Sequence, residues 1–105
     1  MKLDLQINKP FKFKVFATTV NVVWENKRMN DKGQYGECDY SQSKITLSTS
    51  NGVDELSIDK IKDTFYHERA HMILDSMHEY ELSKNERFVD QLAKLWRQTD
   101  ETLEF

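Results

Sequence analysis

Hydrophobic and polar residues alternate along the first half of the chain, and this period of two predicts β-strands. Apolar side chains occupy every second position of residues 3–7 and 11–15, and Pro10 lies between these two runs as a turn residue. β-Branched and aromatic residues predict further strands downstream. The predicted strands are residues 3–7, 11–15, 20–25, 35–40 and 44–49. The polar residues 26–36 predict a loop.

The period changes to that of a helix after residue 52. Ile58, Ile61 and Phe65 fall at helical spacing, and we predict a helix over residues 53–77 with Ser57 as its N-cap. A second apolar stripe predicts a helix over residues 85–98, opened by a capping box at residues 83–86. Strands followed by two helices predict an α+β domain. In that domain a small, mostly antiparallel sheet packs against the two C-terminal helices.

Composition narrows the class of protein. A length of 105 residues predicts a single domain spanning residues 1–105. The net charge is −3 with no basic cluster, so we expect no nucleic-acid partner. The apolar run 17–24 is too short to span a bilayer, and the start MKLDLQINK does not resemble a signal peptide. The single cysteine, Cys38, excludes an internal disulfide, so we expect a cytoplasmic location.

The chemistry-bearing motif is HERAH at residues 67–71, which matches H-E-x-x-H inside the strongest helical segment. In a helix, His67 and His71 stand about 6 Å apart along the axis on nearly the same face, where both imidazoles can bind one zinc ion. Glu68 is rotated by about 100° from His67 and can hydrogen-bond a water held by the metal. The motif predicts a catalytic zinc site, although the same residues could also be the solvated face of a charged helix.

A hydrolytic zinc site needs a third protein ligand and an open position for water. His78 lies on the same predicted helix, about 10.5 Å beyond His71, and no glycine follows Gly52 to break that helix. Glu86 opens the second helix, and an antiparallel hairpin would return it to the middle of the first. Asp90 follows one turn later, where it can accept a hydrogen bond from a ligand histidine. We therefore predict Glu86, and not His78, as the third ligand.

H-E-x-x-H followed on the next helix by E-x-x-x-D resembles the gluzincin group of zinc metallopeptidases, in particular minimal gluzincins and ImmA/IrrE-like or phage-encoded peptidase domains. The resemblance implies that His67, His71 and Glu86 bind Zn²⁺, that Glu68 is the general base, and that Asp90 orients a ligand histidine. It also implies an edge strand that aligns the substrate. The residues of that predicted edge strand are Lys44, Ile45, Thr46, Leu47 and Ser48.

The implied activity is that of a zinc metalloendopeptidase acting on a peptide or protein substrate. Water bound to the zinc would be activated by Glu68 and would attack the scissile carbonyl. The residue that stabilises the oxyanion stays open among four tyrosines, Tyr35, Tyr40, Tyr66 and Tyr80. The oligomeric state is not predicted.

The sequence is also compatible in part with two other classes of function. The chain could be a zinc-containing but catalytically silent or latent regulatory module of phage or bacterial origin. In that case Cys38, or the acidic tail 99–105, would close the site. A nucleic-acid-bound protease of the SprT type is disfavoured because the sequence has no basic patch to support it.

Overall fold

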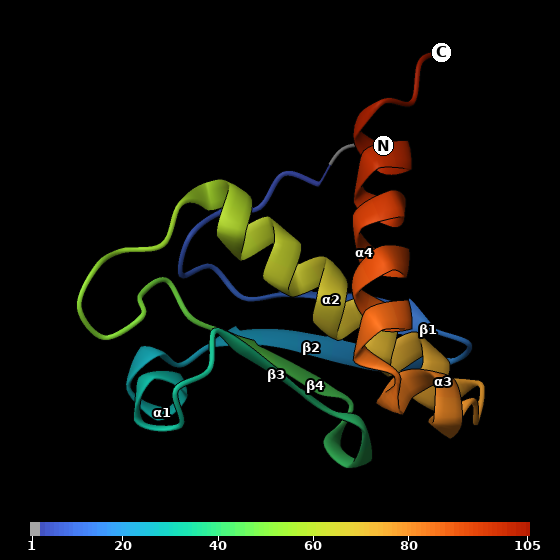
Figure 1. Cartoon of the computed structure of the whole chain (residues 1–105), viewed down its shortest axis with the longest axis horizontal. Helices are drawn as coiled ribbons and strands as arrows, with labels where there is room; N and C mark the ends of the chain where they lie inside the picture. Colours follow the sequence, from blue (N-terminus) through green and yellow to red (C-terminus); the bar gives the residue numbers. More distant parts are fainter. Residues whose placement is uncertain (1–2) are drawn as a thin grey trace.

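The strands lie in the N-terminal half of the chain and the long helices in the C-terminal half, as the α+β prediction requires (Figure 1). The structure, a computed structural model, describes residues 3–105. A 3₁₀ turn, η1, spans Tyr40–Gln42. The strands are β1 (Phe11–Val15), β2 (Thr18–Trp24), β3 (Gly36–Asp39) and β4 (Lys44–Leu47). The helices are α1 (Asn26–Asp31), α2 (Ile58–Ser76), α3 (Tyr80–Lys84) and α4 (Glu86–Glu101).

The sheet has the strand order β1-β2-β4-β3. The two outer pairings are antiparallel and the central β2–β4 pairing is parallel, so the sheet is mixed but mostly antiparallel, as expected. β4 is hydrogen-bonded on both sides, and the prediction that residues 44–48 form the edge strand is therefore wrong. The edge strand on this side of the sheet is β3, whose Glu37 is paired with Thr46 of β4.

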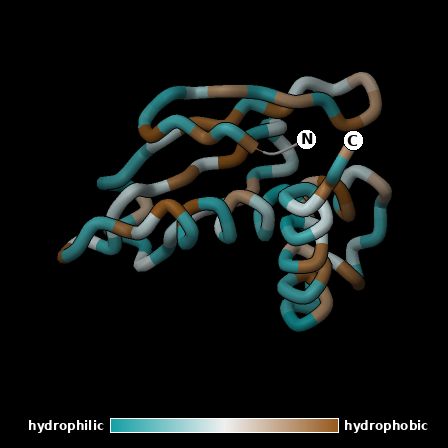
Figure 2. The backbone as a smooth tube through the Cα atoms, turned by 90° about the horizontal axis from the view of Figure 1, so that it is seen from above, coloured by the Kyte–Doolittle hydropathy of each residue, from teal (hydrophilic) through white to brown (hydrophobic). Residues whose placement is uncertain are grey.

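One face of the sheet packs against α2 and forms the core. The ring of Phe65, from α2, lies 5.3 Å from that of Phe11 and 6.0 Å from that of Phe13, both from β1. Figure 2 shows hydrophobic and hydrophilic residues interspersed along the described residues rather than separated into two halves. The buried residues of the core come from β2, β4, α2 and α4, together with Leu5. No helix within residues 3–105 has the length and apolar character needed to cross a membrane.

Two arginines join α4 to α2. The guanidinium of Arg97, on α4, binds the carboxylates of Asp59 and Asp63 on α2, each at 2.7 Å. The guanidinium of Arg69, on α2, lies 3.8 Å from the centre of the Trp96 ring on α4. These contacts fix the direction of α4 relative to α2, and hence the position of the first residue of α4.

Three local predictions differ from the structure. Residues 3–7 are not a strand: the chain turns at Asn8 (φ 62°), Leu5 is buried, Leu3 packs against the core, and Ile7 is exposed. The predicted loop 26–36 contains α1, which is anchored by the fully buried Met29. The capping box at 83–86 is wrong, because Asn85 caps α4 by accepting a hydrogen bond from the Phe88 amide at 3.1 Å. The N-cap at Ser57 is confirmed, although α2 begins at Ile58 rather than at 53.

Candidate metal centre

The two histidines of HERAH meet Glu86 above the middle of α2. His67 Nε2 lies 3.1 Å from one carboxylate oxygen of Glu86, and His71 Nε2 lies 3.3 Å from the other. One donor atom from each of the three residues lies within 4.8 Å of the others. The structure therefore brings together the three residues that the sequence predicts as metal ligands.

The local fold explains how Glu86 reaches the histidines. α2 ends at Ser76, α3 reverses the chain, and Asn85 then caps α4 so that Glu86 becomes its first residue. His78 lies beyond the end of α2 with a φ of 59° and stacks on Tyr80, so it is not part of the cluster.

The donor set fits a zinc ion. Two neutral imidazoles and one carboxylate, with a fourth position left open, are the ligands of catalytic zinc sites. Burial lowers the pKa of His71, which favours the neutral imidazole that a metal needs. The Glu86 side chain is 67% exposed and faces both histidines, and within residues 3–105 it forms no ion pair with a lysine or arginine.

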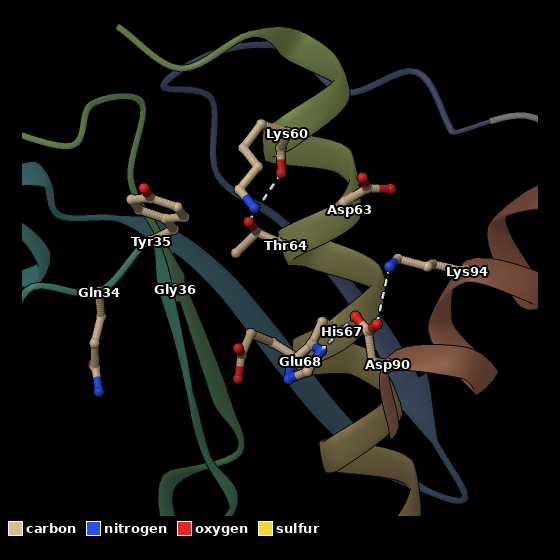
Figure 3. A pocket seen from close by; sticks show the side chains of 10 residues that line it. All are labelled: Gln34, Tyr35, Gly36, Lys60, Asp63, Thr64, His67, Glu68, Asp90 and Lys94. Carbon is tan, nitrogen blue, oxygen red and sulfur yellow. Dashed lines mark hydrogen bonds and ion pairs between the residues drawn. The ribbon is translucent and has the colours of Figure 1, made fainter. Parts of the chain in front are cut away.

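Each histidine has a different neighbour at its second ring nitrogen. His71 Nδ1 lies 3.0 Å from the hydroxyl oxygen of Ser83, a buried residue of α3. His67 Nδ1 lies 3.9 Å from Asp90, which is longer than a hydrogen bond, and Asp90 accepts a hydrogen bond from Lys94 at 2.9 Å (Figure 3). Ser83 is therefore the closer outer partner. Sequence reasoning missed it because Ser83 matched a capping pattern.

Glu68 lies on α2, directly after the ligand His67. Burial, followed by the charges of Glu86 and Glu37, raises the pKa of the Glu68 carboxyl to about 7. Gly36 of β3 passes directly over it: a Cβ atom at Gly36 would lie 3.4 Å from Glu68 Cγ and 2.6 Å from Thr64 Cγ2. The absence of a side chain at Gly36 therefore lets β3 lie against this part of α2.

The site opens into a cleft between β3 and α2. Two adjoining cavities of about 350 Å³ and 330 Å³ form this cleft, and they share Gln34, Gly36, His67 and Glu68 as lining residues. Figure 3 shows the first cavity, with Tyr35 and Gly36 on one side and His67 and Glu68 on the other.

The free edge of β3 borders this cleft. The Ser48 amide donates to the Tyr35 carbonyl at 3.0 Å, which marks that residue pair as hydrogen-bonded. Because hydrogen-bonded and non-hydrogen-bonded pairs alternate in an antiparallel ladder, Glu37 faces β4. The backbone N–H and C=O groups of Gly36 and Cys38 therefore point away from the sheet. These groups are available to pair with an extended peptide.

The four tyrosines that are candidates for stabilising the oxyanion lie in different surroundings. The Tyr66 hydroxyl donates to Asp100 at 2.9 Å, Tyr80 stacks on His78, and Tyr40 lines a different cavity. Tyr35 lines the cleft beside His67 and Glu68. Of the four, Tyr35 is thus the one that borders the metal cluster, and its role in stabilising an oxyanion stays a prediction.

The two features that would close a latent site are Cys38 and the acidic tail 99–105. Cys38 lines the second cavity, but its sulfur does not belong to the group of donor atoms that lie within 4.8 Å of one another. Burial raises the pKa of its thiol to about 12, so the thiol is protonated. The tail follows the far end of α4, about 22 Å along the helix from Glu86 (Figure 1). In this structure neither feature occupies the cluster.

Comparison with known families adds an independent finding. The model of the SprT-like family matches residues 2–97. The chain belongs to the SprT-like family. This is a zinc-metallopeptidase-like family of gluzincin character, so the broad resemblance is confirmed, whereas nothing specific supports the ImmA/IrrE-like variant. No curated protein and no solved structure matches this SprT-like chain.

The family match corrects one step of the sequence reasoning. The lack of a basic cluster disfavours a nucleic-acid-bound protease of the SprT type, yet the SprT-like family model matches residues 2–97. Net charge reports on partners and not on fold, and it was therefore a poor guide to the family. The expectation of no nucleic-acid partner stays a prediction.

Proposed function

We propose that this SprT-like domain is a zinc-dependent metalloendopeptidase that hydrolyses peptide bonds in extended protein segments. The observation that carries the proposal is the convergence of His67, His71 and Glu86 within 4.8 Å of one another, beside Glu68 and below the free edge of β3. The family match supports the same class of chemistry.

Each residue then has a defined task. His67, His71 and Glu86 hold the zinc ion, and Ser83 Oγ accepts the Nδ1 hydrogen of His71, which keeps Nε2 free for the metal. When bound there, zinc supplies Lewis acidity and lowers the pKa of a coordinated water toward 7.

Glu68 moves the proton. Its carboxylate takes a proton from the attacking water and delivers that proton to the nitrogen of the leaving amine. Gly36 and Cys38 hold the substrate extended through their outward N–H and C=O groups, so that the scissile carbonyl lies beside Glu68. This assigns to β3 the task that the sequence had placed on residues 44–48.

The decisive experiment pairs the wild type with Glu68→Gln, both loaded with zinc and incubated with denatured protein. The variant should bind the same amount of zinc and lose about 10²- to 10⁴-fold in cleavage rate, because only the proton carrier has changed. Equal cleavage by both proteins would contradict the role of Glu68. No cleavage by the zinc-loaded wild type would contradict the peptidase proposal itself.

A further inference from the structure

The two ends of the cleft carry opposite charges that have no ion-pair partner among residues 3–105. α2 presents a single stripe of side chains to the cleft, with the ligands near its middle. The α2 residues that line the cleft are Lys60, Asp63, Thr64, His67, Glu68, His71 and Asp75. The two end residues of this stripe are a lysine and an aspartate, so the cleft has an electrostatic direction.

Lys60 is a charged residue of the first cavity whose ammonium group is not engaged by a carboxylate of the described residues. Near it, Asp90 binds Lys94 at 2.9 Å, and Asp63 binds Arg97 at 2.7 Å, an arginine that also binds Asp59 and Glu101. Within residues 3–105, Lys60 forms no ion pair, and its Nζ lies 5.1 Å from the centre of the Tyr35 ring. In Figure 3 this side chain extends over the opening between Tyr35 and Thr64.

Asp75 has the corresponding position in the second cavity. The other outlying acid there, Glu37, is bound by Arg28 at 3.0 Å and by Lys32. Asp75 is half-buried, lines the cavity, and forms no ion pair with any of residues 3–105. A cationic side chain of a bound peptide could therefore pair with it.

The backbone sets which end of a peptide meets which charge. Gly36 at the start of β3 lies against Thr64, and Cys38 lies nearer to Asp75, so β3 runs from the Lys60 end toward the Asp75 end. A peptide paired antiparallel to β3, the slightly more stable arrangement, runs in the opposite direction. Its N-terminal part then lies near Asp75 and its C-terminal part near Lys60.

Distances along the helix give the positions on the peptide. Lys60 precedes His67 by about 10.5 Å, and Asp75 follows His71 by about 6 Å, measured along the axis. An extended chain advances about 3.3 Å per residue. Counted along an extended peptide, Lys60 therefore lies about three residues from the metal cluster and Asp75 about two residues from it.

We infer that the cleft selects extended segments with a basic residue about two positions before the scissile bond and an acidic residue about three positions after it. This substrate class rests on the proposed function, and it assigns Asp75 and Lys60 as residues that determine specificity. The selection is electrostatic, so salt should weaken it.

The test uses three peptides of equal length, labelled with fluorescein. One carries arginine before and glutamate after a central neutral segment, the second has these two residues exchanged, and the third has glutamine at both positions. Binding is measured by fluorescence anisotropy with zinc-loaded Glu68→Gln, and cleavage with the wild type. We expect the first peptide to bind about three- to tenfold more tightly than the second. The difference should shrink between about 0.05 M and about 0.5 M salt.

Reversing the charges of Lys60 and Asp75 tests whether these two residues set the peptide preference. The double variant Lys60→Glu with Asp75→Lys, made in the Glu68→Gln background, should bind the exchanged peptide more tightly than the first. Lys12→Glu, on the outer surface of β1, should leave the original preference unchanged. Equal binding of both charged peptides, a reversed preference in the parent protein, or no binding of either would overturn the inference.

The two proposals fail in different ways. Cleavage by the wild type without a charge preference would leave the peptidase function standing and overturn the inferred substrate class. Binding with the expected preference, but without cleavage of any peptide by the wild type, would overturn the peptidase function and leave the charge-directed binding of extended segments standing.

Discussion

The cleft has two walls that contribute different things to the candidate site. The helical wall, formed by α2 and the first turns of α4, supplies every group with metal or proton chemistry: His67, Glu68, His71 and Glu86. The strand wall, formed by β3, supplies backbone N–H and C=O groups and a close contact at Gly36. Under the proposed function, the chemistry therefore depends on side chains of one wall, and the alignment of a substrate depends on the backbone of the other.

The two walls should respond differently to mutation. Changes on the helical wall should act on metal affinity or on proton transfer, with little effect on the sheet. Changes on the strand wall should act on stability and on substrate alignment, with the metal retained.

The largest effect on metal binding is expected at Glu86. Glu86→Ala should weaken zinc affinity by more than about 100-fold, since a direct ligand should cost more than an outer partner. His78→Ala is the matched control and should leave affinity nearly unchanged, because His78 stacks on Tyr80 outside the cluster. Competition titration with a chromogenic zinc chelator measures both. Tighter binding by Glu86→Ala than by His78→Ala would exclude Glu86 as a ligand.

A smaller effect is expected at the outer partners of the histidines. Ser83→Ala should weaken zinc binding by about tenfold, because His71 Nδ1 loses its partner at 3.0 Å. Asp90→Asn should cost less, since its carboxylate lies 3.9 Å from His67 Nδ1 and is already bound by Lys94. The same titration compares the two variants. A larger loss in Asp90→Asn would mean that the metal draws Asp90 into the hydrogen bond.

The strand wall is tested by Gly36→Ala. The added Cβ would lie 2.6 Å from Thr64 Cγ2 and 3.1 Å from the Thr46 carbonyl oxygen, so β3 or the Thr64 side chain must shift. We expect a loss of about 1–3 kcal/mol in the free energy of unfolding, typical of overpacking, while the zinc content stays the same. Denaturant titration of the zinc-loaded proteins measures it.

A compensating variant makes the Gly36 test specific. Thr64→Ser removes Cγ2, the atom nearest to the added Cβ, so Gly36→Ala with Thr64→Ser should recover part of the lost stability. Thr64→Ser alone is the control. If the double variant were no more stable than the sum of the two single changes predicts, the contact between β3 and α2 would not be the cause.

The helical wall was predictable from the sequence because short-range sequence patterns determine where its residues lie. Two histidines four residues apart share a helix face wherever that helix lies, and the return of Glu86 needs only a short reversal between two helices. The strand wall was not predictable in the same way. Which strand becomes the edge depends on the β2–β4 pairing, a parallel contact that alternation along residues 44–49 does not encode.

Ser83 and Met29 are two further residues whose roles local sequence patterns do not predict. The sequence around Ser83 matches a capping box, but Asn85 caps α4 and the Ser83 hydroxyl binds His71 instead. Nothing in the polar segment 26–36 predicts a helix. α1 exists there because Met29 is fully buried in the fold. In both cases a tertiary contact decided between two local possibilities.

Zinc binding to the purified protein tests the central claim most directly. A site shared by α2 and α4 binds the folded state and not the unfolded chain, so zinc should stabilise the fold. We predict one zinc ion per chain by elemental analysis, a melting temperature that falls by several degrees on chelation, and full recovery when zinc is restored. A protein that contains no zinc after reconstitution, and whose melting temperature is the same with and without chelator, would contradict the assignment of His67, His71 and Glu86 as a metal centre.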